Sequence, residues 1–263
     1  RQLVNFAKEF KVPHDVCGKV IVAANVHEIP LLDKIYHRGH DNATPGIEKI
    51  NSRQIKEIEP FVEGVEGIWV PVTGIIDFKA LCRTLWKQVQ AINPNSELRT
   101  GIVVKGAFSE DGKRGLITNR GKIESRYNIF CAGLHADRMA KVEMPDLETQ
   151  IVGFRGDYYE LTESGTHKVK NLIYPVPNPE FPFLGVHFTR MTDGSIECGP
   201  NAVFSFAREG YSKTAFNLKD SLQALRFGGT WKLFRKHYKQ GIKEYKRAFS
   251  KQLFLHELQR LIP

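Results

Sequence analysis

Cysteine is scarce in this sequence, and the few cysteines are far apart. The 263-residue chain has four, Cys17, Cys82, Cys131 and Cys198, and no Cys-x-x-Cys pair. This spacing excludes a zinc knuckle or a thioredoxin-type dithiol, argues against a disulfide scaffold and favours a reducing compartment. No apolar run reaches the ~18 residues that a membrane-spanning helix needs.

Several motifs of nucleotide and hydrolase sites are also missing. The chain has no Gly-x-Gly-x-x-Gly loop, no Walker loop and no Gly-x-Ser-x-Gly elbow. It therefore carries neither a dinucleotide phosphate-binding loop nor a serine-hydrolase nucleophile of the usual kind. His37 and His40 lie three residues apart without a Glu or Cys ligand nearby, which favours a surface pair. We expect no metal site.

The composition that remains is that of a globular protein. Apolar residues make up 41% of the chain, aromatic residues 11% and charged residues 25%, which excludes extended disorder. The length suits one large domain or two smaller ones. The chain starts at Arg1 without a Met and stops at Pro263 directly after a helical pattern, so we interpret both ends as cut.

Positive charge is concentrated near the carboxyl end. Residues 207–263 hold 13 Lys and Arg against 4 Asp and Glu, whereas the other 206 residues hold 25 of each sign. The lysines alternate with apolar residues at helical spacing. Three interpretations stay open: a solvated face of a packed helix, a surface for anionic lipid or an acidic partner, and a nucleic-acid surface. No nucleic-acid-binding motif accompanies the charge, so we expect no nucleic-acid partner.

Hydrophobic periodicity and turn residues predict an order of elements that mixes α/β and α+β patterns. Ser52 is a plausible cap of one helix and Asp77 of another, and the turn at residues 192–194 predicts a hairpin. Helices are predicted at residues 2–11, 29–41, 51–58, 78–91 and 135–142 and from residue 217 onward. Strands are predicted at 18–23, 67–77 (broken by Pro71 and Gly74), 98–108, 115–118, 122–125, 126–131, 151–161, 171–176, 185–191 and 195–199.

Two segments combine polar and small residues in a way that packing alone does not require. In residues 153–159, Arg155 stands between glycines inside an apolar strand. In residues 174–202, His187 and Thr189 alternate with apolar residues, so both project from one face of a strand. Glycines beside charged strand residues suggest the close approach of a ligand. The alternatives are a buried core histidine and a structural ion pair of Arg155.

Residues 127–137, Tyr-Asn-Ile-Phe-Cys-Ala-Gly-Leu-His-Ala-Asp, resemble a strand–turn–helix signature of the D-amino-acid-oxidase-like flavoproteins. Within that superfamily, the chain is similar to the L-2-hydroxyglutarate dehydrogenase/oxidase family. The most specific matches are residues 181–189 and 199–203. Further matches, in family order, are His14, residues 17–19 and 21–23, residues 59–60, Pro71, and residues 73–77, 154–158, 173–177 and 208–211.

The sequence also departs from that family. Its members begin with a βαβ unit that carries Gly-x-Gly-x-x-Gly and a His-containing loop, and they continue into a Gly-containing segment that closes over the cofactor. We therefore interpret the chain as the interior of a longer protein. The resemblance implies an incomplete FAD-binding domain (residues 1–13 and 77–148) and a substrate domain with a mixed, largely antiparallel sheet and carboxyl-terminal helices (residues 14–76 and 149–263).

The resemblance implies that a hydride passes from C2 of L-2-hydroxyglutarate to FAD while a base removes the hydroxyl proton, giving 2-oxoglutarate. His187 is the candidate base. Arg155 and Arg190 are candidates for the two substrate carboxylates, because Arg can bind a carboxylate through two hydrogen bonds. Further candidates are Tyr174, Thr189 and Asn201 for hydrogen bonds to substrate, and Val104, Ala132 and Gly133 for contacts with FAD.

The same resemblance implies that electrons pass to a quinone or to oxygen. The basic carboxyl-terminal helices suit a peripheral contact with an anionic membrane, and the expected location is the cytoplasm, or the mitochondrion in a eukaryote. Two alternatives remain. One is an amino-acid or amine oxidase of the same superfamily, which would release ammonia. The other is a non-catalytic basic module, which would bind its partner without flavin and in a salt-dependent way.

Overall fold

The computed structural model describes residues 2–110, 112–178 and 183–263, so residues 181 and 182 of the most specific matching motif lie outside the described part. The chain divides into two compact units. The first comprises residues 1–94, 156–203 and 237–263, and the second comprises residues 95–155 and 204–236. These bounds do not test the division into a FAD-binding and a substrate domain, which stays a prediction.

A seven-stranded mixed sheet is the centre of the first unit. Its strand order is β3-β4-β2-β10-β11-β12-β9. Strands β2 and β10 run parallel, whereas β3–β4, β2–β4, β10–β11 and β11–β12 are antiparallel. The bounds are β2 Lys19–Ala23, β3 Glu48–Asn51, β4 Glu66–Val70, β9 Phe154–Glu160, β10 Leu172–Pro175, β11 His187–Arg190 and β12 Ile196–Phe204. The predicted mixed, largely antiparallel sheet is confirmed.

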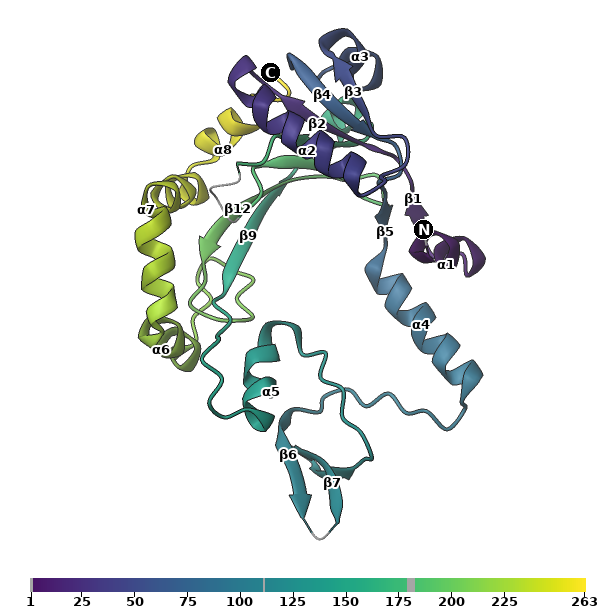
Figure 1. Cartoon of the computed structure of the whole chain (residues 1–263), viewed down its shortest axis with the longest axis vertical. Coiled ribbons are helices and arrows are strands. Elements are labelled where there is room, and N and C mark those ends of the chain that lie inside the picture. Colours follow the sequence, from purple (N-terminus) through teal and green to yellow (C-terminus); the bar gives the residue numbers. More distant parts are fainter. Residues whose placement is uncertain (1, 111, 179–182) are drawn as a thin grey trace. The chain divides into compact units, whose positions relative to one another are not determined.

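Alternation along the strands gives this sheet two different faces. One face packs into the main core, where Val20, Ile173, Phe188 and Cys198 meet Phe254. On the other face, α2 (Ile29–Asp41) covers β2 and β4 (Figure 1) and buries a second apolar cluster. Between β2 and β12 this second face carries polar side chains, which are described below.

The first unit has further elements outside this sheet. A short ladder pairs β1 (His14–Asp15) with β5 (Ile75–Ile76). The remaining elements are α1 Gln2–Glu9, η1 Val26–Glu28, α3 Ser52–Ile58, α4 Phe78–Ile92, η3 Glu163–Lys168 and α8 Lys251–Leu258, together with the part of α7 (Gly228–Phe249) that follows the non-helical residue His237. No helix of the described residues is both long and apolar enough to cross a membrane.

The second unit is built on a three-stranded antiparallel sheet. Its strands are β6 Val104–Glu110, β7 Lys113–Thr118 and β8 Gly121–Glu124. Helix α5 (Ala136–Glu143) follows the short 3-10 turn η2 (Gly133–His135) and lies against β6 (Figure 1). Helix α6 (Leu218–Arg226) and the first part of α7 complete the unit.

Local capping signals were predicted well, with one error. Asp77 caps α4, because its carboxylate accepts from the backbone N–H groups of Lys79 and Ala80 at 2.8 and 2.9 Å. Ser52, by contrast, is the first residue of α3 and not its cap. Asn51 takes that role: its side chain accepts from the backbone of Gln54, whose own side chain accepts from the backbone of Asn51. This reciprocal pair satisfies two donors at once.

Two strand predictions were wrong in whole or in part. Residues 126–131 form no strand, and Tyr127 and Ile129 are 87% and 88% exposed. A strand is stabilised by pairing its backbone with a neighbour, and no strand of the described residues pairs with this segment. The strand predicted at residues 98–108 begins only at Val104, where pairing with Thr118 starts.

Candidate functional site

Three of the predicted site residues meet on the second face of the first unit's sheet. The register pairs Ile173 on β10 with Phe188 on β11, which places Tyr174 opposite His187. The two rings stack with their centroids 3.9 Å apart and an angle of 16° between their planes. Thr189 follows two residues later on the same face. The predicted group of Tyr174, His187 and Thr189 is therefore brought together.

The His187 ring is held in one orientation. It is 5% exposed, and its Nδ1 lies 3.0 Å from the carbonyl oxygen of Gly185. Because a carbonyl only accepts, Nδ1 carries the proton and Nε2 keeps its lone pair. Burial lowers the pKa of His187, the bond to Gly185 opposes this shift, and the charge of Lys19 adds to it. The neutral imidazole is therefore favoured, with Nε2 as a proton acceptor.

Lys19 and Tyr158 border this group, although neither was predicted as a site residue. The Lys19 ammonium lies 5.0 Å from the centroid of the Tyr174 ring. The Tyr158 ring covers Gly199, which is paired with His187: a Cβ at Gly199 would lie 2.5 Å from a Tyr158 ring carbon. The sequence signals for Lys19 were its place in the family match at residues 17–19 and its charge at the start of the apolar strand 19–23.

The two tyrosines of this group are kept in the phenol form. Burial raises the pKa of Tyr174, and a side-chain hydrogen bond with Thr189 partly opposes the shift. Burial also raises the pKa of Tyr158, with a smaller contribution from the charge of Glu197. Both hydroxyl groups can therefore donate a hydrogen bond near neutral pH.

Arg190 and Asn201 do not join this group. Arg190 points to the opposite face of β11 from His187, where it lies 3.2 Å from both the Asp15 carboxylate and the carbonyl oxygen of Lys170. Asn201 is fully buried and uses both ends of its amide: it donates to the Glu244 carbonyl oxygen at 2.8 Å and accepts from Arg247 Nε at 3.1 Å. Its side chain joins β12 to α7.

Arg155, Val104, Ala132 and Gly133 belong to the second unit. Arg155 donates to the carbonyl oxygen of Ser212 at 2.6 Å. Val104 opens β6. Gly133 has a φ of +50°, which favours glycine, and a Cβ built on it would meet no atom within 4 Å. The backbone of this turn is therefore open to the close approach of a ligand.

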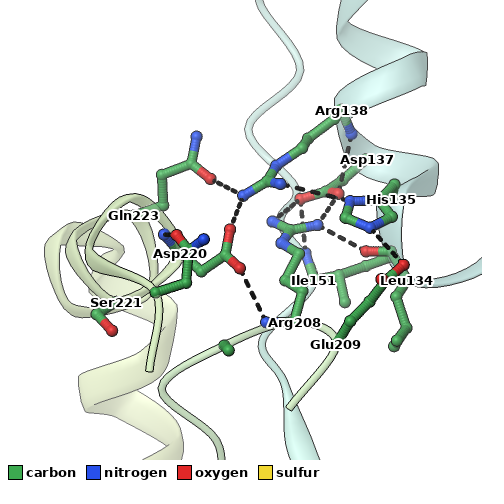
Figure 2. A network of polar contacts seen from close by, with 12 residues as sticks. Leu134, His135, Asp137, Arg138, Ile151, Arg208, Glu209, Asp220, Ser221 and Gln223 are labelled. Carbon is green, nitrogen blue, oxygen red and sulfur yellow. Dashed lines mark hydrogen bonds and ion pairs between the residues drawn. The ribbon is translucent and has the colours of Figure 1, made fainter. Parts of the chain in front are cut away.

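A buried ion pair holds the main chain at Leu134, the residue after Gly133 (Figure 2). The guanidinium of Arg208 donates to both carboxylate oxygens of Asp137, with 2.7 Å for the Nη2–Oδ2 contact, and also to the carbonyl oxygen of Leu134 at 2.8 Å. Both side chains are 5% exposed. Asp137 Oδ2 also accepts a hydrogen bond from the backbone N–H of Ile151 at 3.0 Å. This arrangement joins α5, the 151 segment and the loop after β12.

A second layer of contacts supports this pair. Arg138 forms an ion pair with Asp220 and donates to the Gln223 side chain at 2.5 Å, so α5 is tied to α6. The second oxygen of Asp220 accepts from the backbone N–H of Arg208 at 3.0 Å. His135 contacts Glu209 at 3.1 Å. The matching segment 208–211 thus has a structural role that the sequence alone did not reveal.

Comparison with protein families decides which family this arrangement represents. The family model described as "FAD dependent oxidoreductase" (DAO) matches residues 2–248. The chain belongs to this family. The predicted resemblance to D-amino-acid-oxidase-like flavoproteins is confirmed, and FAD is the cofactor of the family.

Several curated relatives of this FAD-dependent oxidoreductase are L-2-hydroxyglutarate dehydrogenases. L-2-hydroxyglutarate dehydrogenase of Indibacter alkaliphilus is 38% identical over 100% of this chain and 65% of its own length. The mitochondrial enzymes of the same name from Nematostella vectensis and Homo sapiens are 40% and 35% identical over 98% and 99% of this chain, and over 59% and 58% of their own lengths. The chain thus spans about 60% of the relatives it matches.

Solved flavoprotein structures share the fold of this FAD-dependent oxidoreductase. L-α-glycerophosphate oxidase from Mycoplasma pneumoniae, with FAD bound, matches with a TM-score of 0.66 and 21% identity, over 88% of this chain and 60% of that chain. Glycine oxidase from Geobacillus kaustophilus matches with a TM-score of 0.64 and 14% identity, over 78% and 54%. The predicted fold class is confirmed.

The turn at Ala132 and Gly133 fits the cofactor of this FAD-dependent oxidoreductase. The left-handed φ at Gly133 and the empty space beside it let a planar or phosphate-bearing group approach the main chain. Ala132 precedes the turn and presents only a methyl group. Direct contact of these residues, and of Val104, with FAD stays a prediction.

Proposed function

We propose that this protein oxidises L-2-hydroxyglutarate to 2-oxoglutarate with FAD. The observation that carries the proposal is the stacked pair of Tyr174 and His187, which leaves imidazole Nε2 as a fixed proton acceptor on a polar sheet face. The chain that carries this pair belongs to the FAD-dependent oxidoreductase family. Relatives that are 35–40% identical to the chain are named L-2-hydroxyglutarate dehydrogenases.

Each residue has a defined task in this proposal. FAD, when bound, supplies the acceptor for the hydride that leaves C2. His187 accepts the hydroxyl proton at Nε2, and the stacked ring of Tyr174 keeps the imidazole in plane. The hydroxyl groups of Tyr174 and Thr189, which form a hydrogen bond with each other, are the groups that form hydrogen bonds with the substrate. Ala132 and Gly133, with Val104, contact FAD through the main chain.

Two of the residues predicted to bind the substrate already have partners elsewhere in the protein. Arg190 is paired with Asp15 on the other face of β11, so it would have to break that pair to reach a substrate beside His187. Asn201 has no free hydrogen-bonding group, because its amide is bonded at both ends. We therefore leave Arg190 and Asn201 out of the substrate site, and Arg155, which donates to the carbonyl oxygen of Ser212, stays a predicted carboxylate ligand.

Anaerobic reduction of the flavin tests this function. The protein expressed from its complete gene should show a flavin band that bleaches on adding L-2-hydroxyglutarate, but not on adding the D isomer or L-glutamate. Bleaching by L-glutamate with release of ammonia would favour an amino-acid oxidase instead. A flavin band that none of these compounds bleaches would keep the family and remove the proposed substrate.

A peripheral membrane contact is proposed for the basic end of the chain. In α7 after His237, Tyr238, Ile242 and Phe249 are 56%, 53% and 75% exposed, and Lys239 and Lys243 stand beside them. An exposed aromatic stripe flanked by lysines suits the interface of an anionic lipid surface. Cosedimentation with vesicles that contain phosphatidylserine, but not with neutral vesicles, would support this contact; equal sedimentation with both would contradict it.

Separate experiments test the electron acceptor and the cellular location of the protein. A quinone acceptor predicts rapid reduction of a soluble quinone analogue with little oxygen consumption, and an oxygen acceptor predicts formation of hydrogen peroxide. For this chain, cytoplasm or mitochondrion remains the expectation. Fractionation of the source cells tests it.

A further inference from the structure

Lys19 is a cation of the polar sheet face, beside Tyr174. We propose that Lys19 binds the substrate carboxylate remote from the reacting hydroxyl group and thereby selects dicarboxylates over monocarboxylates. This inference rests on the proposed oxidation of L-2-hydroxyglutarate and names the residue that recognises its second charge.

The position of Lys19 relative to His187 suits this role. Lys19 lies on β2, Tyr174 on β10 and His187 on β11, three neighbouring strands of one sheet, and all three side chains project from the same face. Strands lie about 4.8 Å apart, so the β2 and β11 backbones are roughly 10 Å apart. A five-carbon dicarboxylate with a hydrogen bond at each end spans that gap across the Tyr174 ring.

The ammonium of Lys19 also lacks an anion of its own. Within the described residues it forms no hydrogen bond or ion pair, and it makes a cation–π contact with the Tyr174 ring. Lys49 of the same unit is different, because it pairs with Asp33 and with Glu66 at 2.9 Å. A half-buried cation without a counter-ion costs free energy, and an anionic ligand offsets that cost.

The direction of the two pKa shifts agrees with this difference. Burial lowers the pKa of Lys19, and no carboxylate counteracts the shift. At Lys49, hydrogen bonds with Asp33 and Glu66 raise the pKa. A bound substrate carboxylate would raise the pKa of Lys19, as Asp33 and Glu66 raise the pKa of Lys49.

Steady-state kinetics of Lys19→Met with two substrates tests the proposal. L-2-hydroxyglutarate carries the second carboxylate, and L-2-hydroxybutyrate shares its first carboxylate and hydroxyl but lacks the second. Loss of a hydrogen bond to a charged group should raise KM for L-2-hydroxyglutarate about 10- to 100-fold. The value of kcat should stay within a few-fold, and KM for L-2-hydroxybutyrate should hardly change. Lys19→Arg, which keeps the charge, should recover most of the loss.

Lys168→Met is the matched control, because Lys168 also lies over an aromatic ring, that of Phe61 at 5.9 Å, but outside the polar face. It should leave KM for both substrates unchanged. An unchanged KM for L-2-hydroxyglutarate in Lys19→Met, or an equal loss with both substrates, would overturn the proposal.

Binding of glutarate separates failure of this inference from failure of the proposed function. Glutarate has both carboxylates but no hydroxyl to oxidise, and it can be titrated through the flavin absorbance of the holoenzyme. If the wild-type protein does not oxidise L-2-hydroxyglutarate, a weaker glutarate Kd in Lys19→Met still supports Lys19 as the carboxylate ligand. An identical glutarate Kd in both proteins would overturn that role.

Discussion

Arg208 holds Asp137 through both carboxylate oxygens and, with a third hydrogen bond, holds the carbonyl oxygen of Leu134 (Figure 2). Leu134 directly follows Gly133, whose open turn is the predicted contact with FAD. The ion pair therefore connects the loop after β12 to the conformation of that turn. Burial of both side chains makes the connection costly to break.

Arg208→Met should destabilise the protein and loosen FAD together. Removing one partner leaves the Asp137 charge buried, which lowers the free energy of unfolding by about 3–5 kcal/mol. Urea unfolding, monitored by circular dichroism, measures the loss of stability. The fluorescence of FAD released from the protein on dilution measures the weaker binding of FAD. Arg138→Gln is the control, because it removes the contact with Asp220 but leaves the Leu134 carbonyl bonded. If both variants retained FAD equally well, Arg208 would have no specific effect on the turn.

Asp137 should make the stability depend on pH in the acidic range. Burial alone would raise its pKa, but hydrogen bonds from Arg208 and from the backbone of Ile151 outweigh burial and lower the pKa below the usual 3.8. A lowered pKa contributes stability above the unfolded-state value, and this is lost as pH falls through the folded-state value. The Asp137→Asn variant should therefore have a smaller free energy of unfolding at pH 7. Between pH 5 and pH 2, its free energy of unfolding should change less with pH than that of the wild type. Parallel curves for both proteins would contradict this.

His187→Gln should reduce kcat by about 10²- to 10⁴-fold, because it removes a general base. Binding of 2-oxoglutarate should weaken much less. Since burial lowers the pKa of His187 from 6.5, the neutral base persists to lower pH, and kcat/KM of the wild type should fall only below pH 6.5. An acidic limb centred above pH 6.5, or one that persists in His187→Gln, would assign the base to another group.

Gly199→Ala should disturb the polar face from the side of β12. The added Cβ would lie 2.5 Å from a ring carbon of Tyr158, so that ring has to move from its place beside the His187 pair. We expect at least about a tenfold loss of kcat/KM, since displaced site groups lose their alignment. Gly241→Ala, where a Cβ meets no atom within 4 Å, is the control and should leave the activity unchanged.

Phe254→Ala should lower the stability of the protein without a specific effect on the catalysed reaction. Phe254 is 2% exposed and packs on Tyr159 with ring centroids 4.6 Å apart. Its removal leaves a cavity in the main core and should cost about 3–5 kcal/mol in urea unfolding. Leu255→Ala, on the exposed side of the same helix, should change the free energy of unfolding by about 0.5 kcal/mol or less. Equal losses would contradict the assigned core.

Local signals carried most of the successful fold predictions. The helix at residues 29–41 was predicted with its observed bounds, Asp77 caps the next long helix, and the turn at residues 192–194 joins β11 to β12. Each of these features depends on side chains within a few residues of one another. The alternation of His187 and Thr189 with apolar neighbours was likewise sufficient to place both on one face.

Features that depend on distant segments were missed or misread. Residues 126–131 have the composition of a strand, yet a strand also needs a neighbour to pair with. Asn201 lies inside a family-like motif, but its amide is used by Glu244 and Arg247, more than forty residues away. Lys19 lies in the matching segment 17–19, but neither that match nor its charge in an apolar strand indicated that it lies over Tyr174.

The sequence by itself determined the family, most helices and turns, and the pairing of His187 with Thr189 on one face, because these follow from short motifs and from the period of a strand. Only the tertiary structure decided that Tyr174 stacks on His187, that Lys19 lies over Tyr174 and that Arg190 turns to the opposite face. The reason is the strand register: which residues of β2, β10 and β11 stand side by side is fixed when the sheet packs on its core.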